Sequence, residues 1–380
     1  MVVYNGLIQY FVSIFMNIGF YIDEMNYRGV ANSTFFYSSY NQKILKNKSI
    51  IFYNKTNQNN KSDIIKKFKK KFITIGVKNF NEIENYKNKL KLSFIYVQKG
   101  GERNEWVSNK IKTLVHCVYP QKLNEIHGFK YIYISEWLSK NFSKSEIPFV
   151  PLILEQKKIN GNLKKKLKIK KKQLVFGCHG GQSSFDLKFV RDTVFKLVNT
   201  KKDVTFVFLN IKKFCNHPRI IFLKGSSNDI FKKKFINTCD AMIYGRSLGE
   251  SFGLACGEFS VQGKKIISYR FNKHRSHLLN ISNGNFVEYA SRNELNRILT
   301  NFSKVKSNTK NKYHSFKATT VMRIFKKEFL DNKSEIKLSL SSYIYNFISF
   351  SIMNYRYLRH KLYNHYYNIF ESKFIYKEKN

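Results

Sequence analysis

Cysteine, proline and acidic residues are scarce in this sequence. Four of its 380 residues are proline and five are cysteine, at positions 117, 178, 215, 239 and 256. The number of cysteines is odd, no Cys-x-x-Cys pair occurs, and histidines do not cluster beside them at zinc-ligand spacing. This pattern favours neither a disulfide framework nor a structural zinc site, so a reducing cytosol is the simplest location.

Acidic side chains are outnumbered by basic ones, 25 to 68, which gives a formal net charge of +43. Such an excess suggests nucleic acid as a partner, because phosphate backbones attract lysine and arginine. The lysines are spread through nearly every segment, however, and accompany many asparagine, isoleucine, tyrosine and phenylalanine residues. This composition is typical of an AT-rich coding sequence, so a dedicated nucleic-acid site is not expected. The charge would still attract nucleotides and anionic membrane surfaces.

The sequence also lacks a clear signal peptide or membrane-spanning run. Residues 2–22 carry no charge, but no basic segment precedes them, no small-residue cleavage site follows, and Asn5, Gln9 and Asn17 interrupt them. We expect a first strand over Met16–Asp23 with a short apolar extension before it; a membrane anchor in residues 1–15 is the alternative. Residues 338–354 are uncharged as well, but five serines and two asparagines argue against a spanning helix.

The residues that are abundant point to a folded α/β protein. Hydrophobic residues make up 43% and aromatic residues 16% of the chain, which is enough to build the cores of two domains at this length. Short β-branched and aromatic runs alternate with polar, lysine-rich stretches long enough for crossover helices. In the first part, strands are expected at 16–23, 48–53, 72–77, 92–97, 113–118 and 131–134. The alternation predicts a parallel sheet with helices on both faces.

A second sheet is expected after a link at residues 147–173. Prolines exclude a central strand at 147–151, and seven lysines within residues 164–172 suggest a solvated helix. Strands follow at 174–177, 203–209, 220–223, 241–244 and 265–269, and Ser183 or Ser184 is expected to cap a helix that buries Val190 and Val194. We therefore divide the chain into residues 1–150, a linker at 151–172, residues 173–312, and a helical, basic and aromatic tail at 313–380.

One segment, Tyr244 to Glu258, carries the strongest functional signal. Two carboxylates, Glu250 and Glu258, are separated by seven residues, and a Ser-Phe-Gly-Leu turn follows the first. The order strand, glycine-rich turn, helix and strand directs the helix N-terminus to the carboxyl edge of the sheet, where free backbone N–H groups attract phosphate. Both carboxylates could then accept hydrogen bonds from sugar hydroxyls. The alternative is a helix start with one dipole-stabilised and one solvated glutamate.

This segment resembles the donor-binding signature of retaining glycosyltransferases with two Rossmann-like domains, the GT-B architecture. Weaker similarities to that family occur, in the family's order, at Asn26–Val30, Val115–Cys117, Ser135–Leu138 and Phe176–Asp186, so the resemblance covers about residues 17 to 300. It implies an α/β fold with two Rossmann-like domains facing each other across a cleft and a C-terminal helical tail. A terminal helix of such enzymes commonly crosses back to the first domain; this basic, aromatic tail could do so or lie on a membrane.

The resemblance assigns roles to residues of the second domain. Glu250 would lie near the transferred sugar and Glu258 would bind the nucleotide ribose. The diphosphate would be supported by the turn that follows Glu250, formed by Ser251, Phe252, Gly253 and Leu254.

Further phosphate contacts are expected from Arg246, the nearest cation, and from the loop of His179, Gly180 and Gly181. The two glycines would let the backbone approach phosphate oxygens, and His179 could donate to them; an ordinary tight loop is the alternative. Related enzymes often have arginine where Cys178 stands, and nearby cations, including Lys264 and Lys265, could replace it.

In the first domain, His116 ends a predicted strand at a place where related enzymes often have a histidine near the donor sugar or the acceptor. We expect it to be catalytic together with Glu250, and a buried histidine bonded to backbone is the alternative. Arg28 and Gly29 follow the first strand and could approach the donor from the opposite wall of the cleft.

These residues together predict a retaining glycosyltransferase with a nucleotide-sugar donor, most simply a UDP- or GDP-sugar, and a glycan, protein or lipid acceptor. No resident cofactor is expected, and the missing Asp-x-Asp motif agrees with metal independence. One alternative is a nucleotide-sugar epimerase on the same fold. Another is a catalytically inactive scaffold that binds polyanions or membranes.

Overall fold

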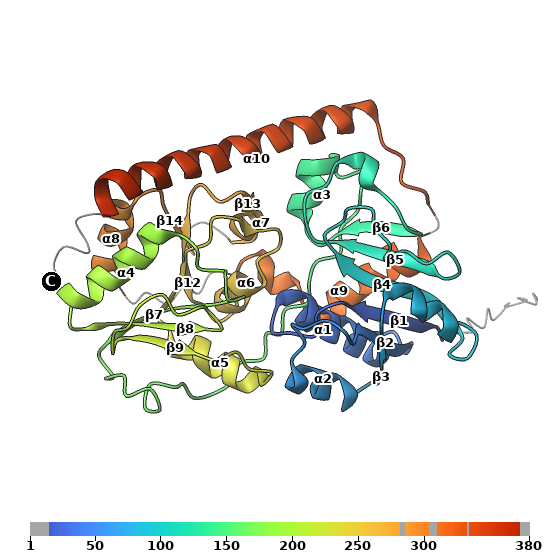
Figure 1. The fold of residues 1–380 in the computed structure, drawn as a ribbon, viewed down its shortest axis with the longest axis horizontal. Coiled ribbons are helices and arrows are strands. Elements are labelled where there is room, and N and C mark those ends of the chain that lie inside the picture. The colour runs from blue at the N-terminus through green and yellow to red at the C-terminus, as the bar shows by residue number, and fades with distance from the viewer. Residues whose placement is uncertain (1–14, 282–285, 304–309, 333, 373–380) are drawn as a thin grey trace, which may run out of the picture.

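The computed structural model describes residues 15–281, 286–303, 310–332 and 334–372. Two α/β domains lie beside each other, and one long helix extends along both of them (Figure 1). Each domain contains a six-stranded sheet whose strand pairs are all parallel. The two Rossmann-like domains are therefore present as expected, whereas the alternative of an anchor in residues 1–15 falls almost entirely outside the described residues.

The first sheet contains every strand that the sequence predicts for this part of the chain. The strand order is β3 (Ile73–Val77), β2 (Lys48–Asn54), β1 (Asn17–Ile22), β4 (Leu92–Lys99), β5 (Lys112–Cys117) and β6 (Lys130–Tyr133). The α-helices of this domain are α1 (Gly29–Lys43), α2 (Ser62–Lys69) and α3 (Glu136–Ser143). The strand order places β1 at the centre, so the loop that follows β1 lies in the middle of one sheet edge.

The second sheet repeats this arrangement. Its order is β14 (Phe286–Tyr289), β12 (Lys265–Tyr269), β10 (Ala241–Tyr244), β7 (Leu174–His179), β8 (Val204–Leu209) and β9 (Ile220–Leu223). Its helices are α4 (Lys188–Thr200), α5 (Asp229–Thr238), α6 (Leu254–Ser260), α7 (Ser276–Asn280) and α8 (Arg292–Thr300). Two short strands, β11 (Gly249–Glu250) and β13 (His274–Arg275), pair beside the sheet. All residues of β8 and β10 are buried, as continuous apolar strands covered on both faces should be.

Two local expectations for the second domain are wrong. Helix α4 buries Val190 and Val194 as predicted, but it begins at Lys188 without a side-chain cap, because Ser184 Oγ instead accepts the Gly181 N–H at 3.0 Å inside the preceding loop. The lysine run at 164–172 forms turns rather than a helix. Like charges one helical turn apart repel each other, and Lys168 adopts a φ of 54°, which breaks the run.

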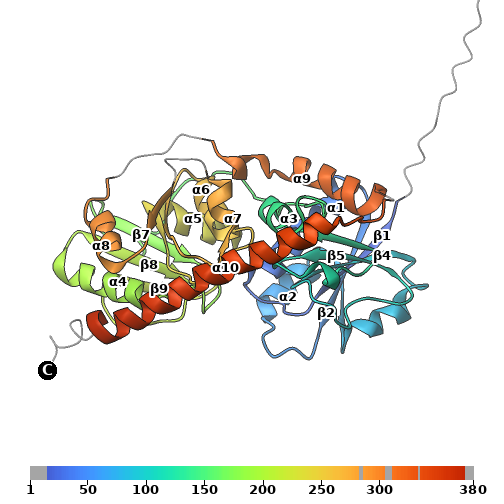
Figure 2. The same ribbon diagram turned by 90° about the horizontal axis from the view of Figure 1, so that it is seen from above.

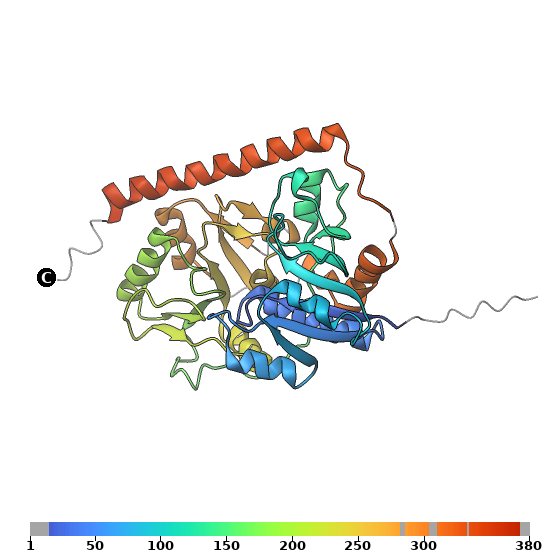
Figure 3. The ribbon, with the colours of Figure 1, turned by 45° about the vertical axis from the view of Figure 1, so that its right-hand side comes forward.

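The tail connects the two domains. Helix α9 (Ala318–Phe325) packs on the first domain, where Phe325 lies against the rings of Tyr37 and Tyr96. The chain then turns back through α10 (Leu340–Tyr366), which extends from α3 to the second domain, as Figures 2 and 3 show. The tail thus contacts the first domain again, which is one of the two arrangements that the sequence left open. Among the described residues, none of the helices combines the length and apolarity that crossing a bilayer requires.

Hydrogen bonds attach α10 at both ends. Near its start, Asn346 Nδ2 donates to the Phe142 carbonyl at 2.8 Å. In its last turn, the Tyr363 hydroxyl accepts the Arg292 N–H at 2.8 Å. Just beyond its end, the buried Tyr367 hydroxyl donates to Asp192 Oδ2 at 2.6 Å. The helix therefore acts as a strap between the domains.

Tyr367→Phe should weaken this attachment. A buried hydrogen bond to a charged acceptor is worth about 1.5–3 kcal/mol, so the free energy of unfolding in urea should fall by about that amount. Tyr366→Phe is the matched control, because Tyr366 is 49% exposed and one residue away. Equal stability of the two variants would contradict the strap.

Candidate functional site

A cleft of about 550 Å³ lies between the two domains. Its lining comes mainly from loops that follow parallel strands, and it includes residues directly after β1, β4, β5, β7 and β10. Carboxyl ends of parallel strands share one edge of a sheet, and ligands of open α/β sheets bind outside that edge. The cleft is therefore the expected place for a ligand-binding site in this fold.

Twelve of the thirteen residues expected in the site line this cleft. Of these twelve residues, ten belong to the second domain, including both glutamates and three of the four glycines. The other two follow β1 in the first domain. The twelve are Arg28, Gly29, His179, Gly180, Gly181, Arg246, Glu250, Ser251, Phe252, Gly253, Leu254 and Glu258.

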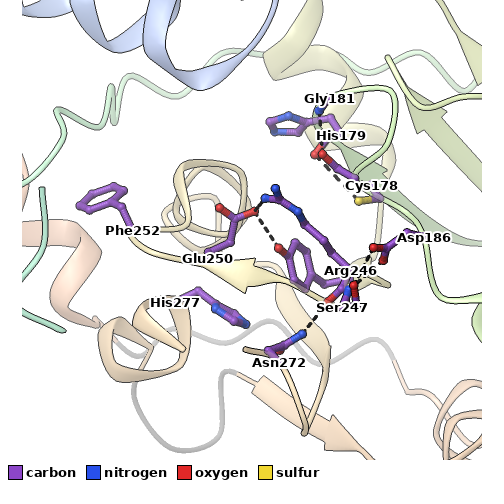
Figure 4. Close-up of polar contacts among 12 residues, drawn as sticks. Cys178, His179, Gly181, Asp186, Arg246, Ser247, Glu250, Phe252, Asn272 and His277 are labelled. Atoms are coloured by element: carbon purple, nitrogen blue, oxygen red, sulfur yellow. Dashed lines mark hydrogen bonds and ion pairs between the residues drawn. The ribbon is translucent and has the colours of Figure 1, made fainter. Parts of the chain in front are cut away.

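Glu250 is held by two donors from the strand and loop before it. Its Oε1 accepts from the Tyr244 hydroxyl at 2.7 Å and from Arg246 Nη1 at 3.1 Å, as Figure 4 shows. The loop itself is fixed by Asn272 Nδ2, which donates to the Arg246 carbonyl at 2.6 Å, and by Asp186, which accepts the Ser247 N–H at 2.7 Å. A charged carboxylate is thus positioned at the cleft before any ligand arrives.

Glu258 lies deeper, with its side chain only 12% exposed. Its Oε1 accepts from Lys232 Nζ at 2.5 Å, and its Oε2 lies 2.9 Å from His179 Nε2 without hydrogen-bond geometry. Burial disfavours the charged form, but the attraction of Lys232 and of the His179 imidazole outweighs it and lowers the pKa of Glu258 to about 2. Glu258 is therefore ionised at neutral pH.

The turn between the two glutamates depends on one glycine. Gly253 has a φ of 85°, and an added Cβ would lie 2.6 Å from the Tyr313 hydroxyl and 2.7 Å from His277 Cβ. The same Tyr313 hydroxyl donates to the Phe252 carbonyl at 2.7 Å. Phe252 is 2% exposed, and its ring packs on Tyr313 and Phe316, so its side chain anchors the turn to the core.

The loop after β7 faces Arg28 from the other domain. A Cβ added at Gly181 would lie 3.7 Å from Arg28 Nε, so the two walls of the cleft approach closely there. Arg28 is itself 3.5 Å from Glu24 Oε2, and its side chain is 61% exposed. The expectation that Arg28 approaches the site from the opposite wall agrees with this placement.

His116 is the residue that the structure does not bring to the cleft. It is fully buried in the first domain, Nδ1 lies 2.6 Å from the Tyr96 hydroxyl, and Nε2 lies 2.8 Å from the Val150 carbonyl. Nε2 must carry the proton, since a carbonyl only accepts, and burial lowers the pKa of the ring to about 3. His116 is therefore the buried, backbone-bonded histidine of the alternative interpretation and takes no part in the site proposed below.

Arg28 and Arg246 line the cleft as expected, but the other cations of the cleft differ from those proposed. Lys264 and Lys265 lie at the start of β12, at the opposite edge of the sheet, and do not line the cleft. Cys178 is buried, which raises the pKa of its thiol. Lys232 from α5 lines the cleft instead. Sequence reasoning missed Lys232, because it is one of three consecutive lysines and only the tertiary fold distinguishes them.

Across the cleft, Lys67 Nζ of α2 lies 3.0 Å from Asp229 Oδ2 of α5, and the Ser135 hydroxyl of the first domain donates to the Ser251 carbonyl of the second. These two contacts hold the walls of the cleft together. Over the described residues, no group of three or more His, Cys, Asp or Glu side chains could hold a metal ion.

Comparison with known proteins identifies the architecture. No protein-family model and no curated protein matches the sequence. A glycosyltransferase from Rickettsia africae ESF-5 superposes with a TM-score of 0.56 at 13% identity, over 90% of this chain and 99% of that one. Anabaena Alr3699/HepE in complex with UDP and glucose gives 0.56 at 10% identity, over 89% and 99%.

A third structure, from Listeria monocytogenes and provisionally assigned as a UDP-N-acetylglucosamine 2-epimerase, gives a TM-score of 0.50 at 10% identity, over 86% of this chain and 100% of that one. The chain therefore has the GT-B fold, as the resemblance of its sequence implied, together with a C-terminal helix. At these identities the similarity establishes the fold alone.

The lowered pKa of Glu258 makes a prediction about acid stability. A carboxyl whose pKa falls from 4.5 to about 2 on folding contributes stability above pH 4.5, which is lost as the pH falls towards 2. The full contribution is roughly 3 kcal/mol. The stability advantage of the wild type over Glu258→Gln in urea should therefore shrink from pH 6 to pH 3. An advantage that does not change with pH would show that Glu258 is not held as an ion.

Proposed function

We propose that the protein is a retaining glycosyltransferase that transfers a sugar from a nucleotide-sugar donor, most simply a UDP- or GDP-sugar, to a glycan, protein or lipid acceptor. The observation that carries this proposal is the convergence of both glutamates, the turn between them and the His179–Gly181 loop on one cleft between two Rossmann-like domains. The HepE structure, which contains UDP and glucose in a protein of this fold, supports a donor of that class.

The proposed donor site lies mainly on the side of the cleft that the second domain forms. Glu258, ionised and held by Lys232, would accept hydrogen bonds from the ribose hydroxyls. The diphosphate would lie along the Gly180–Gly181 backbone, with the positive charges of Lys232, Arg246 and Arg28 around it. No resident cofactor or metal is part of this proposal.

The reaction breaks the bond between the anomeric carbon and the diphosphate oxygen. The acceptor oxygen bonds to the same carbon on the same face, and its proton passes to the departing diphosphate. Positive charge develops at the sugar ring as the leaving group departs, and the carboxylate of Glu250 is positioned to stabilise it. Stabilisation of this kind acts in the transition state more than in the bound donor.

A nucleotide-sugar epimerase is the second candidate, because one protein assigned to that activity shares the fold. An epimerase would release an altered sugar without any acceptor, so analysis of the products separates the two activities. A catalytically inactive scaffold that binds polyanions is separated by nucleotide binding itself. In a thermal-shift screen, a nucleotide at 100 times its dissociation constant adds about 2.7 kcal/mol of stability. The proposal fails if no nucleoside diphosphate or nucleotide sugar stabilises the protein.

Glu258→Gln should weaken nucleotide binding. The exchange keeps the size of the side chain and removes the charged acceptor, so affinity for the nucleoside diphosphate should fall by about 1.5–3 kcal/mol in calorimetry. Glu146→Gln is the control, because Glu146 follows α3, accepts from Ser339 and does not line the cleft. Unchanged affinity in Glu258→Gln would remove this residue from the site.

Glu250→Ala should affect turnover more than binding. Losing a preorganised electrostatic contact typically lowers the rate by about two orders of magnitude or more, while nucleoside-diphosphate affinity moves little. The product should keep the anomeric configuration of the donor, which proton NMR of the first-formed glycoside detects. An inverted anomeric centre would reject the retaining mechanism.

A further inference from the structure

Helix α10 presents a long apolar face to solvent. Of the twenty large hydrophobic side chains that are exposed in the described part of the chain, fourteen lie between residues 340 and 370. The most exposed are Leu340 at 77%, Phe347 at 73% and Leu362 at 62%. Isolated exposed hydrophobic residues are normal, but many exposed apolar side chains gathered on one helix mark an interaction site.

Much of the apolar surface of α10 lies on the face directed away from the protein. Its exposed apolar residues recur at helical spacing on one face, through Leu340, Ile344, Phe347, Tyr355, Leu358 and Leu362. The opposite face is attached by polar groups: Ser342 donates to the Ser143 carbonyl, and Asn346 donates to the carbonyls of Gln121 and Phe142. The same inner face packs Phe350 against the Phe142 ring and buries Met353, so α10 has apolar side chains on both faces, and those of the outer face are exposed.

The charged residues that border this face indicate what kind of partner it would bind. Residues 340–366 contain Arg356, Arg359 and Lys361 and no aspartate or glutamate. Lys144 donates to Ser341 at the start of the helix, and Lys273 Nζ lies 5.4 Å from the centre of the Tyr357 ring farther along. Acidic groups also face the helix: Glu146 accepts from Ser339 before its start, Glu288 acts on Arg356, and Asp186 acts on His360. The apolar face is thus bordered mainly by positive charge.

The shape of the helix agrees with a flat partner. In Figures 1 and 3, α10 lies straight along the outside of the molecule, over both domains, and no other described segment covers its outer side. A helix that lies in the plane of a bilayer buries its apolar face at the boundary of headgroups and acyl chains, while flanking lysines and arginines contact anionic headgroups. A second copy would bring together two chains of net charge +43, which repel each other.

We propose that the apolar face of α10 docks the protein, with the helix parallel to the surface, on a bilayer containing anionic lipid. The docking is independent of the proposed catalytic activity, because none of the α10 residues lines the cleft. It places both domains on one side of the membrane surface and gives the tail a function beyond that of a strap.

Co-sedimentation with vesicles tests the docking. The full chain should sediment with vesicles of equimolar phosphatidylcholine and phosphatidylglycerol and not with phosphatidylcholine alone. The double variant Phe347→Gln/Leu362→Gln should lose about tenfold or more of its affinity, because two large apolar side chains no longer enter the bilayer. The control Ile73→Gln/Ile230→Gln changes side chains that are 46% and 58% exposed, on β3 and α5 away from α10, and should bind like the wild type.

A tryptophan probe separates insertion from simple charge attraction. Leu358→Trp should show blue-shifted emission on addition of the anionic vesicles, relative to the two native tryptophans, whereas Ile230→Trp should not. The proposal is overturned if the wild type does not bind the anionic vesicles, if the α10 double variant binds as tightly as the wild type, or if the probe stays in water. A dimer in light scattering that the same double variant abolishes would assign the face to a second copy instead.

Discussion

The parallel sheets of the two domains end at a shared cleft, and the arrangement of the site depends on this constraint. Every strand of a parallel sheet delivers its following loop to the same edge. Arg28 after β1, His179 at the end of β7 and Arg246 after β10 are distant in sequence, yet all three line one cleft. Lysines at the start of a strand, such as Lys265, cannot reach it. Topology thus decides which of the many positive charges lie near the carboxylates.

The two glutamates on the second-domain side of the cleft each lie beside a cation. Glu250 is paired with Arg246, and Glu258 with Lys232, in both cases through side chains of the second domain. Removing one partner of such a pair leaves a poorly solvated charge, so these pairs contribute to the stability of the fold. The half of the cleft that contains both glutamates is consequently organised within one domain, and the first domain closes it from the opposite side.

The connections between the domains have two different characters. At the cleft, contacts such as Lys67 to Asp229 are polar and lie beside the site, where they limit separation of the walls. On the outer surface, α10 joins the domains through hydrogen bonds of its inner face, and its apolar face remains outside. A bilayer under α10 would contact both domains at once, so docking would also limit their relative movement.

The sequence by itself determined the alternation of strands and crossover segments, because that alternation follows from local periodicity. The GT-B fold was implied by the resemblance of the segment from Tyr244 to Glu258 to a known family, and the spacing of Glu250 and Glu258 placed both near the start of one helix. The buried role of His116 was decided only by the tertiary structure. The carbonyl of Val150 and the ring of Phe329 enclose it, and the latter comes from more than two hundred residues away in the chain. Lys232 was selected from a lysine-rich helix in the same way. Spacing shows which residues share an element; only the packing of distant segments determines which side chains are enclosed and which reach the cleft.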